Sequence, residues 1–200
     1  MKKFFSLLFS GFLVLFVVAQ DVAVKTSYTR KPALGISFFF NDYTTAQRIR
    51  STSLSSVFAN KQTAKLIDMH PGIGLTYFQG LSEHIDFAGT LASSFVAYDA
   101  SNGGTETEEN FLLEADASAN FKLLSEKYVV SPYASLGVGF SKYSVYYGAF
   151  IPVGLGLKVN IFDEAHIFLN SSYRIPVIAN TAAYHFMHAI GFAGVMGGKK

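Results

Sequence analysis

Cysteine and tryptophan are both absent from the 200-residue chain. Without cysteine there is no disulfide, no thiolate metal site, no cysteine nucleophile and no lipidated N-terminal cysteine. Charged residues make up only 15% of the sequence although 50% of it is apolar. No run of about 20 apolar residues follows the N-terminus, which excludes a later transmembrane helix. The apolar residues must therefore lie in short segments, and the abundance of Phe, Tyr and Gly favours strands over helices.

Residues 1–19 are predicted to be a signal peptide, with residues 20–200 forming one domain. Lys2 and Lys3 form a basic n-region, Phe4–Val18 an apolar h-region, and Ala19 ends a small-residue cleavage site. An uncleaved membrane anchor is the alternative, although the apolar run is shorter than the ~20 residues that a spanning helix needs. Removal of the two lysines leaves 14 basic against 14 acidic residues. The mature chain is then formally neutral, and nucleic acid is not an expected partner.

Strict alternation of apolar and polar residues is the main pattern along the rest of the chain. From Leu113 to Leu123 the odd positions are apolar and the even positions are polar or charged. A period of two places each set on its own face of a strand, whereas a helix would mix them. The same pattern predicts eight strands, at Ala33–Phe40, Gly72–Gln79, Ile85–Val96, Phe111–Leu123, Val129–Ser141, Ala149–Ile161, His166–Val177 and Tyr184–Val195.

The connections between these strands alternate in length. Three are short (81–84, 124–127 and 162–165), and four are longer or richer in Tyr, Asn and Gly (41–71, 97–110, 142–148 and 178–183). An up-and-down barrel places all odd connections at one rim, and outer-membrane barrels have short periplasmic turns and longer extracellular loops. The fold is therefore predicted to be an all-β, eight-stranded antiparallel transmembrane barrel with both termini in the periplasm.

The polar faces of the strands favour a membrane barrel over a soluble secreted barrel that carries an apolar ligand. The polar face of 129–141 consists mostly of Ser and Gly, and that of 149–161 includes two glycines, Lys158 and Asn160. A water-facing surface would carry more charge, whereas small residues suit the crowded interior of an eight-stranded barrel. Aromatic residues near the predicted strand ends are consistent with membrane girdles: Phe38, Phe40, Tyr77, Phe95, Phe111, Phe121, Tyr128, Phe140, Tyr147, Phe162, Tyr173, Tyr184 and Phe192.

Three segments carry a resemblance to a known family. Residues Phe38–Ala46, Leu112–Asn120 and Gly148–Pro152 resemble the N-terminal barrel of OmpA-like outer-membrane proteins from Bacteroidetes. The resemblance covers the whole mature chain and implies fold and location more than activity. Relatives often continue into a peptidoglycan-binding domain, but this sequence ends at Lys200, so that role is not carried over.

The charged residues of the inward faces are the first candidate site. Asp86, Glu114, Asp116, Lys122, Lys158 and Arg174 are expected in the lumen as a mutually neutralising network, because buried charges need partners. Asp86 and Lys122 lie at the same rim of neighbouring strands and are expected to pair. The network is predicted to plug the barrel, with the gating of a narrow ion pathway as the alternative.

The long first loop, 41–71, is the second candidate site. Arg48, Arg50 and Lys61 make it a candidate surface contact, with anionic lipopolysaccharide as the expected partner. Residues 53–59 are predicted to form a short helical turn. A loop of this length is usually functional or disordered.

Catalytic and cofactor motifs are weak in this sequence. The histidines are interpreted as turn or rim residues, and His185 and His188 lie on opposite strand faces, so a shared metal is not expected. The Gly-Val-Gly and Gly-Leu-Gly segments at 137–139 and 154–156 lack the third glycine of a dinucleotide loop. No cofactor and no catalysis are expected. The predicted function is a structural, envelope-integrity or surface-binding role in the outer membrane with a surface or periplasmic protein partner, and the alternatives are a narrow pore, a lipid-modifying enzyme or a soluble secreted barrel.

Overall fold

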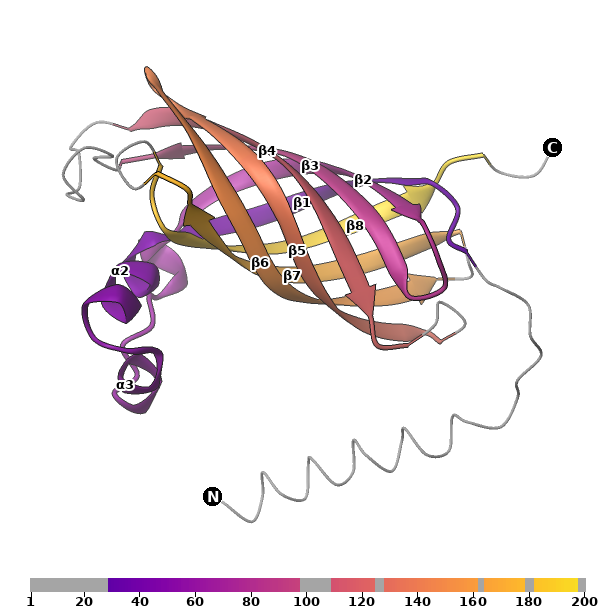
Figure 1. Cartoon of the computed structure of the whole chain (residues 1–200), viewed down its shortest axis with the longest axis horizontal. Helices are drawn as coiled ribbons and strands as arrows, with labels where there is room; N and C mark the ends of the chain where they lie inside the picture. The colour runs from indigo at the N-terminus through magenta and orange to yellow at the C-terminus, as the bar shows by residue number, and fades with distance from the viewer. Residues whose placement is uncertain (1–28, 98–108, 125–127, 162–163, 179–181, 198–200) are drawn as a thin grey trace, which may run out of the picture.

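Eight antiparallel strands close into a single barrel in the order β1 to β8 (Figure 1). The computed structural model describes residues 29–97, 109–124, 128–161, 164–178 and 182–197. The strands are β1 (Ala33–Asp42), β2 (His70–Gly80), β3 (Ile85–Val96), β4 (Asn110–Lys122), β5 (Val130–Tyr143), β6 (Tyr146–Ile161), β7 (Ala165–Pro176) and β8 (His185–Val195). The eight-stranded fold expected from the sequence is confirmed. The predicted signal peptide, the middle of the 97–110 connection and Phe162 lie outside the described residues.

One connection differs from the sequence prediction. The expected loop at 142–148 is a turn of two residues, Ser144 and Val145, because β5 and β6 continue past their predicted ends. Lys142 pairs with Tyr147 across the extended ladder, and its ammonium lies 5.7 Å from the centre of the Tyr147 ring. Ser144 adopts φ 51° to close the turn. The tyrosines were read as loop residues, whereas they are the β-forming residues that extend the hairpin.

The barrel interior holds large aromatic side chains as well as the small residues expected there. Four inward aromatics each face an inward glycine in register on the neighbouring strand: Phe39 with Gly72, Tyr133 with Gly156, Phe150 with Gly139, and Phe168 with Gly191. A Cβ added at any of these glycines would collide with the facing ring. Because these glycines have no side chain, each facing ring can occupy the lumen beside them. This explains why Gly139 of β5 and Gly156 of β6 are glycines.

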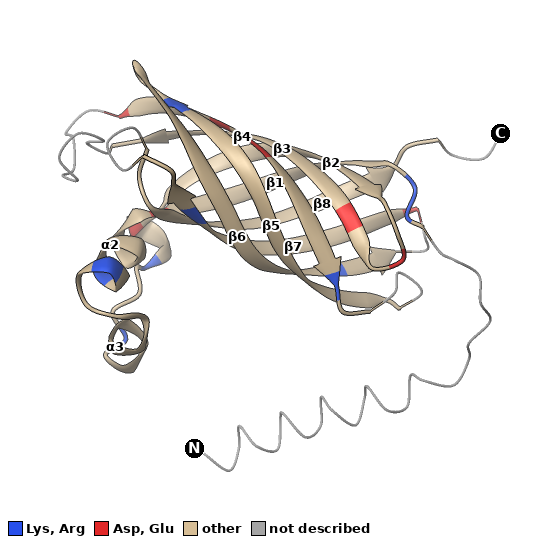
Figure 2. Ribbon diagram, viewed as in Figure 1, with Lys and Arg blue, Asp and Glu red and all other residues tan. Residues whose placement is uncertain are grey.

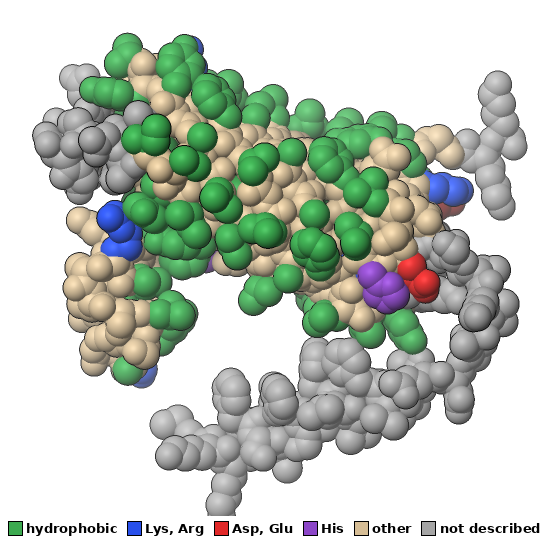
Figure 3. All heavy atoms as spheres, viewed as in Figure 1, with side chains coloured by type: hydrophobic (Ala, Val, Ile, Leu, Met, Phe, Trp, Pro, Cys, Tyr) green, Lys and Arg blue, Asp and Glu red, His purple; other side chains and the backbone are tan. Residues whose placement is uncertain are grey.

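On the face that Figure 3 shows, apolar side chains are spread along the length of the barrel. Phe38, Val138 and Leu155 expose 66%, 67% and 71% of their surface. Figure 2 shows few charged residues along the strands and several in the helical segment between β1 and β2. A soluble barrel would place such residues inward, so this surface requires an apolar environment.

A helical segment between β1 and β2 projects from the end of the barrel where the longer connections lie (Figure 1). It contains α2 (Tyr43–Ser51), α3 (Leu54–Ala59) and the short helix η1 (Leu66–Asp68). The predicted turn at 53–59 is confirmed as α3, whereas α2 was not predicted. The carboxylate of Asp42 caps α2 by accepting a 2.8 Å hydrogen bond from the Thr45 amide. No helix among the described residues is long and apolar enough to cross a membrane.

Candidate functional site: two buried charge clusters and a surface arm

The six charged residues expected in the lumen all lie on the inner face of the barrel, in two groups at opposite ends. The short-turn cluster consists of Asp86, Lys122 and Lys158, near the end where the short turns lie. Asp86 Oδ1 accepts from Lys122 Nζ at 2.7 Å, and Asp86 Oδ2 accepts from Lys158 Nζ at 2.6 Å. All three side chains have no exposed surface. The Asp86–Lys122 pair joins neighbouring strands as expected, and Lys158 of β6 reaches the pair across the lumen.

Aromatic rings surround the second lysine of this cluster. Lys158 Nζ lies 4.8 Å from the centre of the Phe78 ring and 5.4 Å from that of Tyr133. The negative faces of these rings attract the Lys158 ammonium, and the attraction is stronger because the site holds little water. The fully buried His166 lies beside them, 5.0 Å from Phe78 between ring centres. The short-turn cluster is thus enclosed by rings as well as by charge partners.

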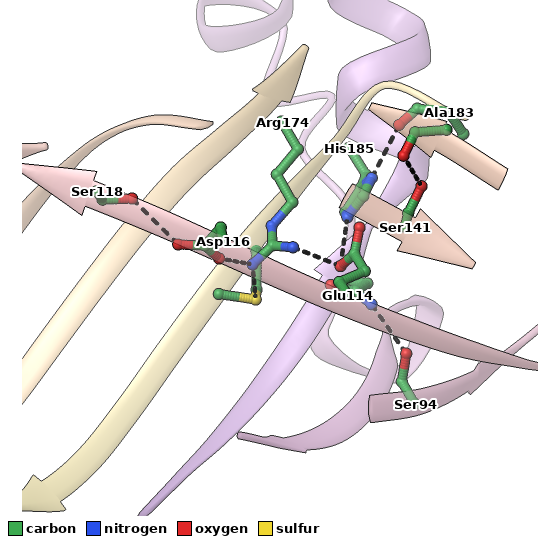
Figure 4. A network of polar contacts seen from close by, with 11 residues as sticks. Ser94, Glu114, Asp116, Ser118, Ser141, Arg174, Ala183 and His185 are labelled. Atoms are coloured by element: carbon green, nitrogen blue, oxygen red, sulfur yellow. Dashed lines mark hydrogen bonds and ion pairs between the residues drawn. The ribbon is translucent and has the colours of Figure 1, made fainter. Parts of the chain in front are cut away.

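The long-loop cluster consists of Glu114, Asp116, Arg174 and His185 (Figure 4). Arg174 donates to Glu114 Oε2 at 2.6 Å and to Asp116 Oδ2 at 3.2 Å. His185 Nε2 lies 3.5 Å from the same Glu114 oxygen. The Arg174 guanidinium also lies 4.7 Å from the centre of the Phe150 ring. One cation therefore holds two carboxylates that come from a strand on another side of the barrel.

A tyrosine of the helical segment covers this cluster from the outside. Tyr43 begins α2, and its ring stacks on His185 with 4.7 Å between ring centres. It also packs against Val96, Leu112 and Tyr143, which form a buried apolar group at this end of the lumen. Side chains from α2, β3, β4, β5 and β8 therefore meet at this end of the barrel.

Two small cavities lie inside the described part of the barrel. One of about 30 Å³ lies in the middle of the lumen, and one of about 20 Å³ lies at the long-loop end, where Tyr43 and Glu114 are part of its lining. Spaces of this size hold one or two water molecules each. Neither cavity is large enough to hold a continuous column of water along the barrel.

The arm, defined as residues 43–69, places the second set of predicted residues at the surface. Arg48 donates to the Gln62 carbonyl at 2.7 Å, and the Arg50 guanidinium lies 3.9 Å from the centre of the Tyr184 ring in front of β8. Lys61 is exposed and adopts φ 53° after α3. The arm also exposes Leu54, Phe58, Leu66 and Ile67, which sequence reasoning did not single out.

The structure corrects the interpretation of the histidines as turn or rim residues in part, since His84 does lie in the short turn before β3 and His70 begins β2. His166 and His185 are buried inside the barrel, with 0% and 3% of their surface exposed. His188 lies on the outer face within β8, and its Nδ1 is 2.9 Å from Ser171 Oγ. The opposite orientation of His185 and His188 is confirmed. Among the described residues, no three His, Asp or Glu side chains are grouped so as to hold a metal ion.

Comparison with known proteins gives a likeness of fold. No protein-family model and no curated protein matches the sequence. The structure is similar to Neisserial surface protein A (NspA), with a TM-score of 0.52 and 11% identity over 84% of this chain and 99% of NspA. Lower scores relate it to Ail of Yersinia pestis (0.48, 14% identity, 83% and 98% covered) and to the N-terminal barrel of Pseudomonas aeruginosa OprF (0.46, 13% identity, 84% and 98% covered).

These observations define the class of the protein. The chain has an eight-stranded antiparallel barrel fold like that of the outer-membrane barrel NspA. The barrel part of the sequence resemblance is thereby confirmed. The particular likeness to proteins of Bacteroidetes stays a prediction.

Proposed function

We propose that this protein is a closed barrel with a structural or surface-binding role in the outer membrane and without catalysis, and that its arm binds lipopolysaccharide. The packed lumen carries the first part of this proposal. Ion pairs lie near both ends of the described lumen, and the cavity in its middle has a volume of about 30 Å³. An ion pathway would need a continuous column of water, and eight strands leave little room for one.

The chemistry of the arm supports the second part. The arm lies at the long-loop end, which faces the cell exterior in outer-membrane barrels, and it extends to one side of the barrel (Figure 1). Its exposed apolar residues include Phe58 and Ile67, with 61% and 89% of their surface exposed. Arg48, Arg50 and Lys61 are exposed on the same arm. Apolar side chains beside basic ones are typical of segments that lie in an anionic lipid interface, and the outer leaflet supplies phosphates through lipopolysaccharide.

A titration with fluorescent, short-saccharide lipopolysaccharide tests the proposed contact. The protein is refolded in zwitterionic detergent and compared with the variant R48A/R50A/K61A. Each basic residue near an anionic surface contributes about 1 kcal/mol, so the triple variant should bind about 100-fold more weakly, and the difference should shrink at high salt.

Lys142→Ala is the matched control, because Lys142 is also an exposed cation at the long-loop end. It should change the affinity little. Equal losses in the control and the triple variant would show that general positive charge, and not the arm, attracts the lipid. Equal affinity of the triple variant and the parent protein for lipopolysaccharide would contradict the proposal that the arm binds this lipid.

A further inference from the structure

A polar pair on the outer surface of the barrel is not used by anything described so far. Ser171 of β7 and His188 of β8 face each other in register, and both point outward. Ser171 Oγ and His188 Nδ1 are 2.9 Å apart. Their outward neighbours on the same strands include Leu169 and Ile190, with 43% and 52% of their surface exposed. Polar groups on a lipid-facing surface are costly unless they have partners.

A groove lies directly beside this pair. It has a volume of about 560 Å³ and is lined by outward apolar side chains together with the pair itself. Its apolar lining includes Leu155 and Leu157 of β6, Leu169 of β7, Ile190 of β8 and Phe40 of β1. The groove is open along the outer surface, so its occupant would lie against the outside of the barrel. The groove is therefore a shallow apolar surface with the Ser171–His188 pair in its lining.

On the long-loop side of the pair, aromatic rings lead to a cation. Phe186 stacks on His188 with 5.8 Å between ring centres, and Tyr173 lies 4.7 Å from Phe186. Tyr184 lies 6.1 Å from Tyr173, and Arg50 of the arm lies over Tyr184. The order along the outer face is thus a cation, an aromatic girdle, a hydrogen-bonding pair and an apolar groove.

We propose that this face of β7 and β8 binds one lipopolysaccharide molecule through its lipid A part. A phosphate lies at Arg50, an acyl carbonyl accepts a hydrogen bond from the Ser171–His188 pair, and an acyl chain occupies the groove. The sequence of contacts on the protein matches the order of charge, carbonyl and hydrocarbon in such a lipid. The proposal rests on the proposed function, since it names the surface that binds the lipid contacted by the arm.

The pair is assigned to binding and not to ester hydrolysis. A serine nucleophile needs a histidine that is itself oriented by a third group. Among the described residues no carboxylate accepts a hydrogen bond from His188, and the nearby Asp42 carboxylate caps α2 instead. The pair can donate and accept hydrogen bonds, and that is the function the geometry supports.

Variants of the pair test the proposal in the lipopolysaccharide titration. S171A and H188A should each bind about five-fold more weakly, because each removes part of a hydrogen-bonded unit. H188Q, which keeps a hydrogen-bonding side chain, should recover part of the loss. L155W, which fills the groove from a lipid-facing position, should weaken binding without touching the pair. A heat-dependent mobility shift in gels confirms for each variant that the barrel is closed.

Ser93→Ala is the matched control. Ser93 also points outward and lines a smaller groove of about 280 Å³ between β2 and β3, but that lining contains no histidine. S93A should leave the affinity unchanged. The same titration with phosphatidylglycerol tests the source of the phosphate, and it should show no difference between S171A, H188A and the parent protein.

The outcomes separate this proposal from the proposed function. If R48A/R50A/K61A weakens binding while S171A, H188A and L155W do not, the arm contacts the lipid but the groove is not its seat, and the inference is overturned. If H188A weakens phosphatidylglycerol binding equally, the groove takes phospholipid and the assignment to lipopolysaccharide is wrong. Losses in S171A, H188A and L155W that are specific to lipopolysaccharide, with S93A unchanged, support it.

Discussion

Replacing Arg174 by methionine should strongly destabilise the barrel, because Arg174 is the cation that holds two buried carboxylates. Arg174 has 0% of its surface exposed. Its guanidinium nitrogens lie 2.6 Å from an oxygen of Glu114 and 3.2 Å from an oxygen of Asp116. Methionine matches the stem of arginine and lacks the atoms at the end of the guanidinium. The variant therefore removes the charge and the hydrogen bonds together with the packing of the guanidinium on Phe150.

The expected loss follows from the burial of the partners. Glu114 and Asp116 side chains are 2% and 8% exposed, so water cannot replace the missing guanidinium. Removing one partner of a buried ion pair costs about 3–5 kcal/mol, and the lost contact with Phe150 adds about 0.5–2 kcal/mol. We expect R174M to lower the free energy of unfolding by about 4–6 kcal/mol.

Urea unfolding in phospholipid vesicles, followed by circular dichroism and by heat-dependent gel mobility, measures this loss. The triple variant R174M/E114Q/D116N has no buried charge without a partner, and it should recover part of the stability because the cost of the unpaired carboxylates is removed. K142M, at an exposed hairpin end, should change stability by no more than about 0.5 kcal/mol. A loss below about 1 kcal/mol in R174M, or an equal loss in the triple variant, would refute the assignment of stability to charge compensation.

Three further expectations test the packing, the orientation and the closed lumen. Gly139→Ala should destabilise the barrel by about 1–3 kcal/mol because its Cβ would meet the Phe150 ring, whereas Gly194→Ala, which has nothing within 4 Å of the added carbon, should have little effect in the same unfolding assay. Because the chain has no tryptophan, a single Trp at Leu155 can be compared with one at Val145. Lipids brominated near the bilayer centre should quench Trp at Leu155 strongly and Trp at the hairpin turn weakly, and the reverse order would contradict the membrane orientation. Planar-bilayer recordings of the refolded protein should show no discrete conductance steps, and regular steps would overturn the plugged lumen in favour of a pore.

The sequence by itself determined the strands and their faces. A side-chain period of two is a local property of extended backbone, and the alternation in 113–123 needs no tertiary information to assign Glu114, Asp116 and Lys122 to one face. The contact between Asp86 and Lys122 was also predictable, because both residues lie at the same end of strands joined in an antiparallel ladder. The glycines at 139 and 156 were correctly read as positions that need small side chains.

Only the closed barrel decided which distant residues meet. Arg174 and Glu114 are 60 positions apart on strands that are not neighbours, and their contact depends on the stagger of the ladder around the whole barrel. The same stagger places each inward ring opposite a glycine and Ser171 opposite His188, whereas alternation fixes a face but not a register. The stagger also separates the buried charges into two clusters, whereas the alternation of the strands predicted a single network. The sequence thus fixes the orientation of each side chain, and closure of the sheet selects its partner.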